Sequence, residues 1–207
     1  RKSAWKKSWR ASCFAIQKRT PISVSQLPWR MADKTTHFGR AGEFFAMSEL
    51  LLRGWNVAVP VVDVGDDVFV IDDKDKTSYR VQVKSAEPKP LDNGRYTASF
   101  SLSRKQLNAP RRMELFYMFL VRISTRWRFL VVPREDLAQI RDAAEATYTG
   151  AGRPPVLASE AKADGLTLAI ELSDSGASVW RTSLDRFLEQ WPAQLPVIDA
   201  GPGTRSR

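Results

Sequence analysis

This chain of 207 residues has one cysteine, Cys13, and one histidine, His37. Structural disulfides and zinc sites built from Cys and His are therefore excluded, and catalysis by a Cys–His pair is not expected. Any metal must be held by oxygen ligands, which favours Mg²⁺ or Mn²⁺. No apolar run approaches the roughly 20 residues that span a bilayer. We therefore expect a soluble, cytoplasmic protein that does not bind membranes.

Acidic residues are absent from residues 1–30, which contain eight Lys and Arg residues and so supply most of the net charge of +9. The rest of the chain is nearly neutral, so the high pI says little about nucleic-acid binding. Met31 and the residues after it resemble a natural start, and we expect residues 1–30 to be an upstream extension. A disordered basic arm that binds phosphates and an Arg- and Ser-rich transit segment stay open as alternatives.

Residues 65–84 predict two short strands joined by a charged turn. The first strand opens on Asp67. The second, over 79–84, alternates in polarity, so Gln82 and Lys84 share one face. A carboxylate, an amide oxygen and an ammonium on adjacent strands can hold a divalent cation beside a lysine that activates water, which suits phosphodiester hydrolysis. A hairpin with ordinary solvated charges is the alternative interpretation.

A helix is predicted over 39–53, because apolar side chains recur there at helical spacing and Gly54 follows as a stop signal. Glu43 falls inside the apolar stripe of this helix. A carboxylate on a packing face needs a partner, and a metal shared with Asp67 would provide one. The alternative is that Glu43 is a first-turn acid that complements the helix dipole.

The order of these motifs is more specific than any one of them. Gly-Glu on a helix, then Gly-Asp-Asp-Val-Phe-Val and Gln-Val-Lys on two strands resembles the PD-(D/E)XK nuclease superfamily. It is similar to archaeal Holliday junction resolvases and to small restriction-like endonucleases over about residues 37–133. The resemblance implies an α/β fold of the restriction-endonuclease-like type, with a mixed central sheet flanked by helices. It also implies a metal-dependent endonuclease that hydrolyses DNA.

The resemblance assigns a role to each motif residue. Glu43, Asp67 and Gln82 would hold Mg²⁺ or Mn²⁺ together with the backbone carbonyl of Val83, and Lys84 would orient or activate the attacking water. We expect these side chains to converge on one point. Gln82 replaces the usual Asp or Glu; its carbonyl oxygen can bind a hard cation but brings no charge. A catalytically inactive DNA-binding module with the same fold is the alternative.

Basic residues gather at 101–130, which contain seven Lys and Arg residues and one acid. Such a strip can bind phosphates, although a solvated hairpin edge is the alternative. The sequence leaves open whether the protein is a homodimer. The residues expected to contact DNA are Arg104, Lys105, Arg111 and Arg112.

The remaining elements complete an α/β layer with a C-terminal strand-helix extension. We expect a disordered basic extension over 1–36, one nuclease-like domain over 37–195 and a flexible tail over 196–207. The further elements expected inside the domain are a strand over 96–102, a short helix capped by Ser103, a hairpin over 115–132, a helix after Pro133, a strand over 166–172 and a helix over 183–191.

Overall fold

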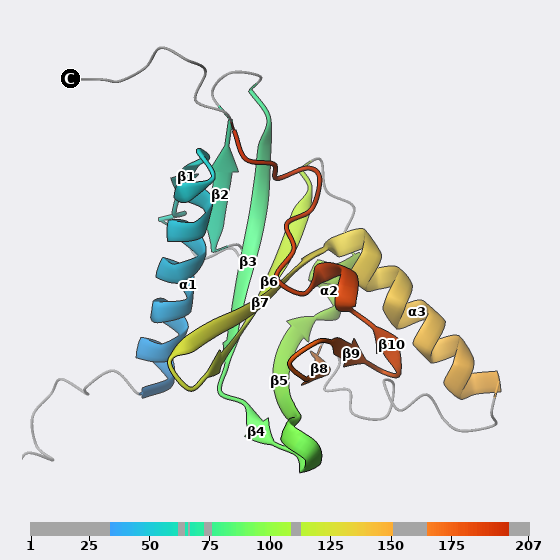
Figure 1. Cartoon of the computed structure of the whole chain (residues 1–207). Helices are drawn as coiled ribbons and strands as arrows, with labels where there is room; N and C mark the ends of the chain where they lie inside the picture. The colour runs from blue at the N-terminus through green and yellow to red at the C-terminus, as the bar shows by residue number, and fades with distance from the viewer. Residues whose placement is uncertain are drawn as a thin grey trace, which may run out of the picture. The chain divides into compact units, whose positions relative to one another are not determined.

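A computed structural model describes the protein over residues 34–61, 65, 67–72, 76–108, 113–150 and 165–198. The described part is mixed α/β, with two sheets and flanking helices (Figure 1). It has no helix whose length and apolar character would let it cross a bilayer. The α-helices of this part are α1 (Lys34–Leu52), α2 (Arg104–Asn108) and α3 (Arg134–Gly150).

The first sheet, called sheet A here, has the strand order β1-β2-β3-β6-β7. β3 and β6 are parallel and the other neighbours are antiparallel. A parallel pair needs a long crossover, and β4, β5 and α2 provide it. The strands of sheet A are β1 (Asn56–Ala58), β2 (Val68–Ile71), β3 (Ser78–Ala86), β6 (Leu115–Ile123) and β7 (Arg126–Pro133).

The second sheet, sheet B, is antiparallel throughout and has the order β10-β9-β8-β5-β4. In β5 and β8 buried and exposed residues alternate, so one face of sheet B is packed and the other is solvated. The strands of sheet B are β4 (Lys89–Pro90), β5 (Tyr96–Ser103), β8 (Gly165–Leu172), β9 (Ala177–Val179) and β10 (Thr182–Ser183).

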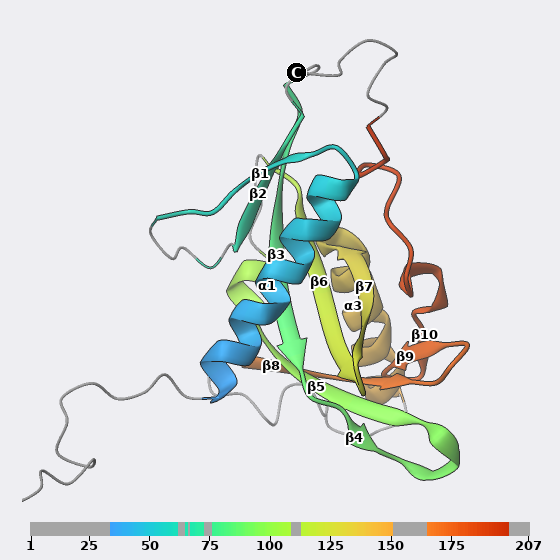
Figure 2. The same ribbon diagram turned by 60° about the vertical axis from the view of Figure 1, so that its left-hand side comes forward.

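Sheet A is covered on both faces, which gives two apolar clusters. Helix α1 buries Ala46 and Leu50 against one face, where Val83 of β3 lies. Sheet B and α3 cover the other face, where Phe100 of β5 and Phe119 of β6 pack with ring centroids 5.0 Å apart. Figure 1 shows α1 and α3 on opposite sides of sheet A, and Figure 2 shows α1 crossing in front of it.

The α/β class and most of the expected elements are confirmed. The predicted helix over 39–53 is α1, which begins earlier, at Lys34, and ends before Gly54, whose φ is +87°. Ser103 does cap α2, because its hydroxyl accepts a hydrogen bond from the Gln106 N–H at 3.1 Å. The strand β5, the β6–β7 hairpin, α3 after Pro133 and the strand β8 are also where the sequence predicts them.

The C-terminal extension differs from the expectation in one element. The helix predicted over 183–191 is β10 followed by a single 3-10 turn, Asp185–Phe187. Leu184 and Phe187 are buried as predicted, but one short turn is enough to bury them. Glu189 has a φ of +55° and its N–H donates to a backbone carbonyl of β7, which prevents the helix from continuing.

The two ends of the chain are described only in part. Residues 1–33, including Met31, lie outside the described residues, and α1 begins within the stretch expected as an extension. In the stretch expected as a tail, Pro196 accepts a hydrogen bond from the Trp55 indole at 2.9 Å, and Ile198 donates to the carbonyl of Arg53 at 2.8 Å. Residues 199–207 lie outside the described part.

Candidate functional site

The candidate site lies where β2 begins, beside the middle of β3. The two strands pair only as far as Val68 and Val81, so from Gln82 onward no strand of the described residues neighbours β3 on this side. Asp67 directly precedes β2. Its N–H donates to the Val81 carbonyl at 3.2 Å, and its carboxylate Oδ2 accepts a hydrogen bond from the Val83 N–H at 2.7 Å. Asp67 is thus bound to the backbone on both sides of Gln82.

The Val83 carbonyl shares this edge. In an extended strand the N–H and C=O of one residue point to the same side of the strand. Because the N–H of Val83 reaches the Asp67 carboxylate, its carbonyl oxygen also points toward the unpaired edge. The Val83 side chain instead packs in the cluster under α1. One backbone oxygen and one carboxylate therefore face the same stretch of edge.

Gln82 and Lys84 project from the face of β3 opposite α1, as their spacing predicts. They are in register with Tyr117 and Phe119 of β6, which belong to the cluster beneath sheet B. Gln82 is only 6% exposed, and its Oε1 has no hydrogen-bond donor among the described residues. Lys84 is half-buried. A buried amide oxygen without a donor is costly, and a bound cation would relieve that cost.

The donors at this edge fit a hard cation. The carboxylate of Asp67, the amide oxygen of Gln82 and the carbonyl of Val83 are all oxygen ligands, the type that Mg²⁺ and Mn²⁺ prefer. Within the described part of the chain, no cluster of three or more His, Cys, Asp or Glu side chains is placed to hold a metal. Asp66 lies outside the described residues. The described donors thus bring a single negative charge, which predicts weak binding.

Glu43 comes from a different direction. It lies on α1, which packs on the face of sheet A opposite the Gln82 side chain. Its carboxylate accepts a hydrogen bond from Arg40 at 2.5 Å, and its side chain is 20% exposed. The structure therefore places Asp67 beside the stretch of β3 that carries Gln82 and Lys84. It holds Glu43 across the sheet, in an ion pair with Arg40. Its role as a metal ligand stays a prediction.

The flank of α1 that carries Glu43 can be assigned from its neighbours. Phe45 contacts Trp127 of β7, with ring centroids 6.0 Å apart. The flank of α1 that carries Phe45 therefore faces the β7 side of the sheet. At about 100° per residue, a side chain two positions earlier lies on the opposite flank. Glu43 therefore faces the side of β3 where β2 begins, the side that carries the Asp67 carboxylate.

Gln106 is a residue near the site that the sequence analysis did not single out. It is 8% exposed, and its side-chain amide donates to the Gly65 carbonyl at 2.5 Å. Gly65 has a φ of +83° and lies two residues before Asp67. The Ser103-x-x-Gln106 spacing is typical of a capping box, so the sequence held a signal. In the structure, the hydrogen bond from the Gln106 amide holds the chain in position just before β2.

The predicted DNA contacts differ in their surroundings. The guanidinium of Arg104 lies 3.5 Å from the Glu145 carboxylate, which neutralises part of its charge. Lys105 is exposed at the surface of α2. Arg111 and Arg112 lie outside the described residues. The role of these four residues in DNA binding stays a prediction.

No protein-family model and no curated protein matches this sequence. Among solved structures, the chain is similar to a bacterial homing endonuclease, I-Ssp6803I. The match has 23% sequence identity and a TM-score of 0.38, and it covers 52% of this chain and 74% of that chain. A likeness this small identifies no functional residue.

Proposed function

We propose that this protein is a metal-dependent endonuclease that hydrolyses DNA phosphodiester bonds. One observation carries the proposal. Asp67 is bound to the backbone on both sides of Gln82, and Gln82 has a buried amide oxygen without a donor among the described residues. Lys84 is the next side chain on the same face of β3, so an ammonium stands beside a set of hard oxygen donors.

The residues would divide the work as follows. Asp67 and Gln82, with the Val83 carbonyl, would hold Mg²⁺ or Mn²⁺, a Lewis acid that polarises a phosphate oxygen and lowers the pKa of water. The ammonium of Lys84 has three N–H donors and no acceptor. It would orient the attacking water and stabilise the negative charge that develops on the phosphate. The hydrogen bond from Val83 holds the Asp67 carboxylate at the edge before substrate binds.

A DNA-binding module without turnover is the second candidate. The described donors include one carboxylate, and Gln82 supplies a neutral oxygen where an acid would add a charge. If the site binds a cation too weakly, hydrolysis is lost, but the basic side chains that bind phosphates remain. Metal-dependent cleavage separates the two candidates.

The test is relaxation of supercoiled plasmid by the whole protein with Mg²⁺ and with Mn²⁺. The wild type should nick the plasmid, and Asp67→Asn and Lys84→Ala should each lower the rate by at least about 100-fold. Both variants should still bind DNA in EDTA, because the Lys and Arg side chains of the strip at 101–130 supply that affinity. Asp174→Asn, which changes an exposed acid in the turn between β8 and β9, is the matched control.

Two results would overturn the proposal. Strong cleavage by Asp67→Asn would show that the site is elsewhere. Metal-independent DNA binding without any nicking by the wild type, and unchanged by Lys84→Ala, would establish the binding module instead.

A further inference from the structure

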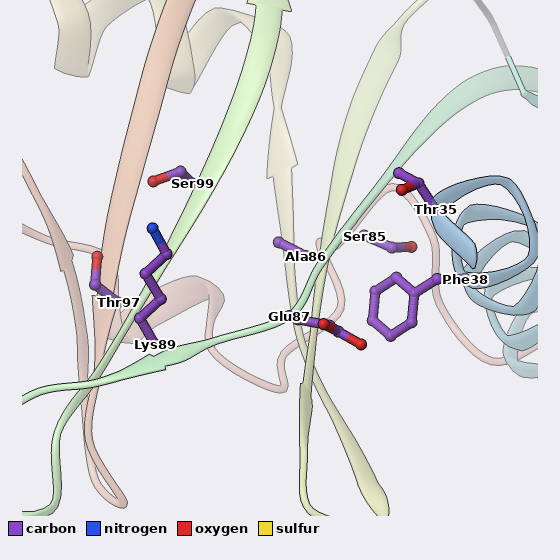
Figure 3. A pocket seen from close by; sticks show the side chains of 8 residues that line it. All are labelled: Thr35, Phe38, Ser85, Ala86, Glu87, Lys89, Thr97 and Ser99. Carbon is purple, nitrogen blue, oxygen red and sulfur yellow. The ribbon is translucent and has the colours of Figure 1, made fainter. Parts of the chain in front are cut away.

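A cavity of about 340 Å³ opens at the C-terminal end of β3, next to the candidate site. It lies between the first turns of α1, the end of β3 and the strands β4 and β5 (Figure 3). Its volume falls within the range of small-molecule and nucleotide pockets. Its walls include Phe38 of α1, Ser85 of β3, Lys89 of β4, and Thr97 and Ser99 of β5.

The cavity continues the line of the candidate site. Ser85 directly follows Lys84 on β3, so the two residues lie within about 4 Å along the strand, on opposite faces. Lys89, on the far wall, is five residues from Lys84, at most about 17 Å along an extended chain. Because one DNA strand advances about 3.4 Å per nucleotide along a duplex, this interval corresponds to a few nucleotides.

One wall of the cavity has the chemistry of a base-stacking site. The ring of Phe38 packs on Trp127, with centroids 5.2 Å apart, so its position is fixed by the β6–β7 hairpin. Trp127 in turn carries the guanidinium of Arg122 over its ring at 5.3 Å. Aromatic side chains bind bases of any sequence by stacking, and neighbouring cations strengthen the interaction.

The opposite wall has the chemistry of a phosphate site. Lys89 and Thr97 form a cross-strand pair, and Ser99 follows Thr97 on the outer face of β5. In Figure 3 the side chains of Lys89, Thr97 and Ser99 stand together across the cavity from Phe38. Ammonium and hydroxyl groups are common phosphate donors. Glu87 also lines the cavity; like Lys89 it is exposed, so solvent screens both charges.

We propose that this cavity is a subsite for one nucleotide of the DNA strand that flanks the phosphate at Lys84. Phe38 stacks on the base, and Lys89 with Thr97 and Ser99 binds a neighbouring phosphate. The inference rests on the proposed nuclease function for the phosphate at Lys84, but its binding chemistry can be measured without cleavage.

The test is fluorescence anisotropy of the whole protein with a short fluorescein-labelled DNA, in EDTA and at several salt concentrations. Phe38→Leu keeps apolar volume beside Trp127 but removes the aromatic face, and should weaken binding about tenfold. Phe38→Tyr should restore it. Lys89→Gln should lower the slope of log K against log[salt] by about 0.7 to 0.9, as expected for one lost phosphate contact. Arg181→Gln, in the exposed β9–β10 turn, is the charge control and should bind like the wild type.

The outcomes separate this inference from the proposed function. If Phe38→Leu and Lys89→Gln bind DNA as tightly as the Arg181→Gln control, the subsite is wrong, whatever the nicking assay shows. If the wild type nicks plasmid through Asp67 while these variants bind normally, only the subsite fails. If binding depends on Phe38 and Lys89 but no metal supports nicking, the subsite stands and the nuclease proposal fails.

Discussion

Gly42 of α1 packs directly on Ser85 of β3. A Cβ atom built on Gly42 would lie 1.9 Å from the Ser85 hydroxyl oxygen and 3.2 Å from a Leu120 methyl group. Only a residue without a side chain allows α1 to approach the sheet this closely. Because Glu43 is the next residue, this contact also fixes how far the Glu43 carboxylate stands from β3.

Replacing Gly42 should therefore destabilise the protein although the substitution favours a helix. Gly42→Ala gains helix propensity worth about 1 kcal/mol, but forcing a methyl group into the contact costs about 1–3 kcal/mol. We expect the free energy of unfolding, measured by urea denaturation, to fall by up to about 2 kcal/mol. Gly39→Ala is the matched control, because a Cβ there meets no atom of the described residues within 4 Å. It should stabilise the protein by about 0.5–1 kcal/mol.

A double-mutant cycle identifies the contact. The Ser85 hydroxyl is buried and has no hydrogen-bond partner among the described residues, so Ser85→Ala should cost little. In the Ser85→Ala background, Gly42→Ala should be less destabilising than in the wild type. Equal effects in both backgrounds would show that the Ser85 hydroxyl is not what Gly42 accommodates.

The stability of the C-terminal extension should depend on the ionisation of Asp185. The Ala177 N–H donates to its carboxylate at 2.7 Å. This hydrogen bond, and after it one from Ser183, lowers the pKa of Asp185 below its ordinary value. Because the pKa is lower in the folded state, the stabilisation is present above the unfolded-state pKa and is lost as pH falls through the folded-state pKa.

Asp185→Asn should reduce this pH dependence. As pH falls below about 4, the free energy of unfolding of the wild type should fall more steeply than that of the variant. Asp174→Asn, an exposed acid of the preceding turn, is the control. Urea denaturation curves across this range check the prediction, and identical slopes for wild type and Asp185→Asn would contradict it.

The sequence predicts the local features of the site well because they depend on short periods. The alternation of β3 places Gln82 and Lys84 on one face, and the spacing in α1 places Glu43 near its buried side. Neither period reports which face of sheet A the helix covers. The covered face is decided by the packing of α1 against Val83. Because Val83 and Gln82 point to opposite faces of β3, Glu43 lies across the sheet from Gln82.

Local sequence patterns do not predict sheet B. β5 and β8 read clearly as strands, but their pairing joins Phe100 to Leu168 across more than sixty residues. Alternation identifies a strand with one buried face and not its partner. The role of Gln106 is hidden for the same reason, because its acceptor, the Gly65 carbonyl, comes from a distant loop.

Gln106 should act on the site by positioning the chain before Asp67. Gln106→Met keeps the side-chain volume but removes the donor to the Gly65 carbonyl, at a cost of about 1–2 kcal/mol. Because Gly65 leads into Asp67, we also expect weaker Mn²⁺ binding by isothermal titration calorimetry. Gln139→Met, on the exposed face of α3, is the control. A variant that loses stability but keeps the wild-type Mn²⁺ affinity would assign Gln106 to the fold alone.

The charge at position 82 gives the sharpest test of the cation site. Gln82→Glu places a second carboxylate beside Asp67 in a buried position, where two like charges without a cation destabilise each other. In EDTA the melting temperature of the variant should therefore be lower than that of the wild type. With Mn²⁺ the added charge should tighten binding by about tenfold or more, and linkage should raise the melting temperature of the variant more than that of the wild type. Gln139→Glu, exposed on α3, should show neither effect. Differential scanning calorimetry with and without Mn²⁺ measures both effects. If Mn²⁺ does not change the melting temperature of Gln82→Glu, no cation binds at this edge of β3.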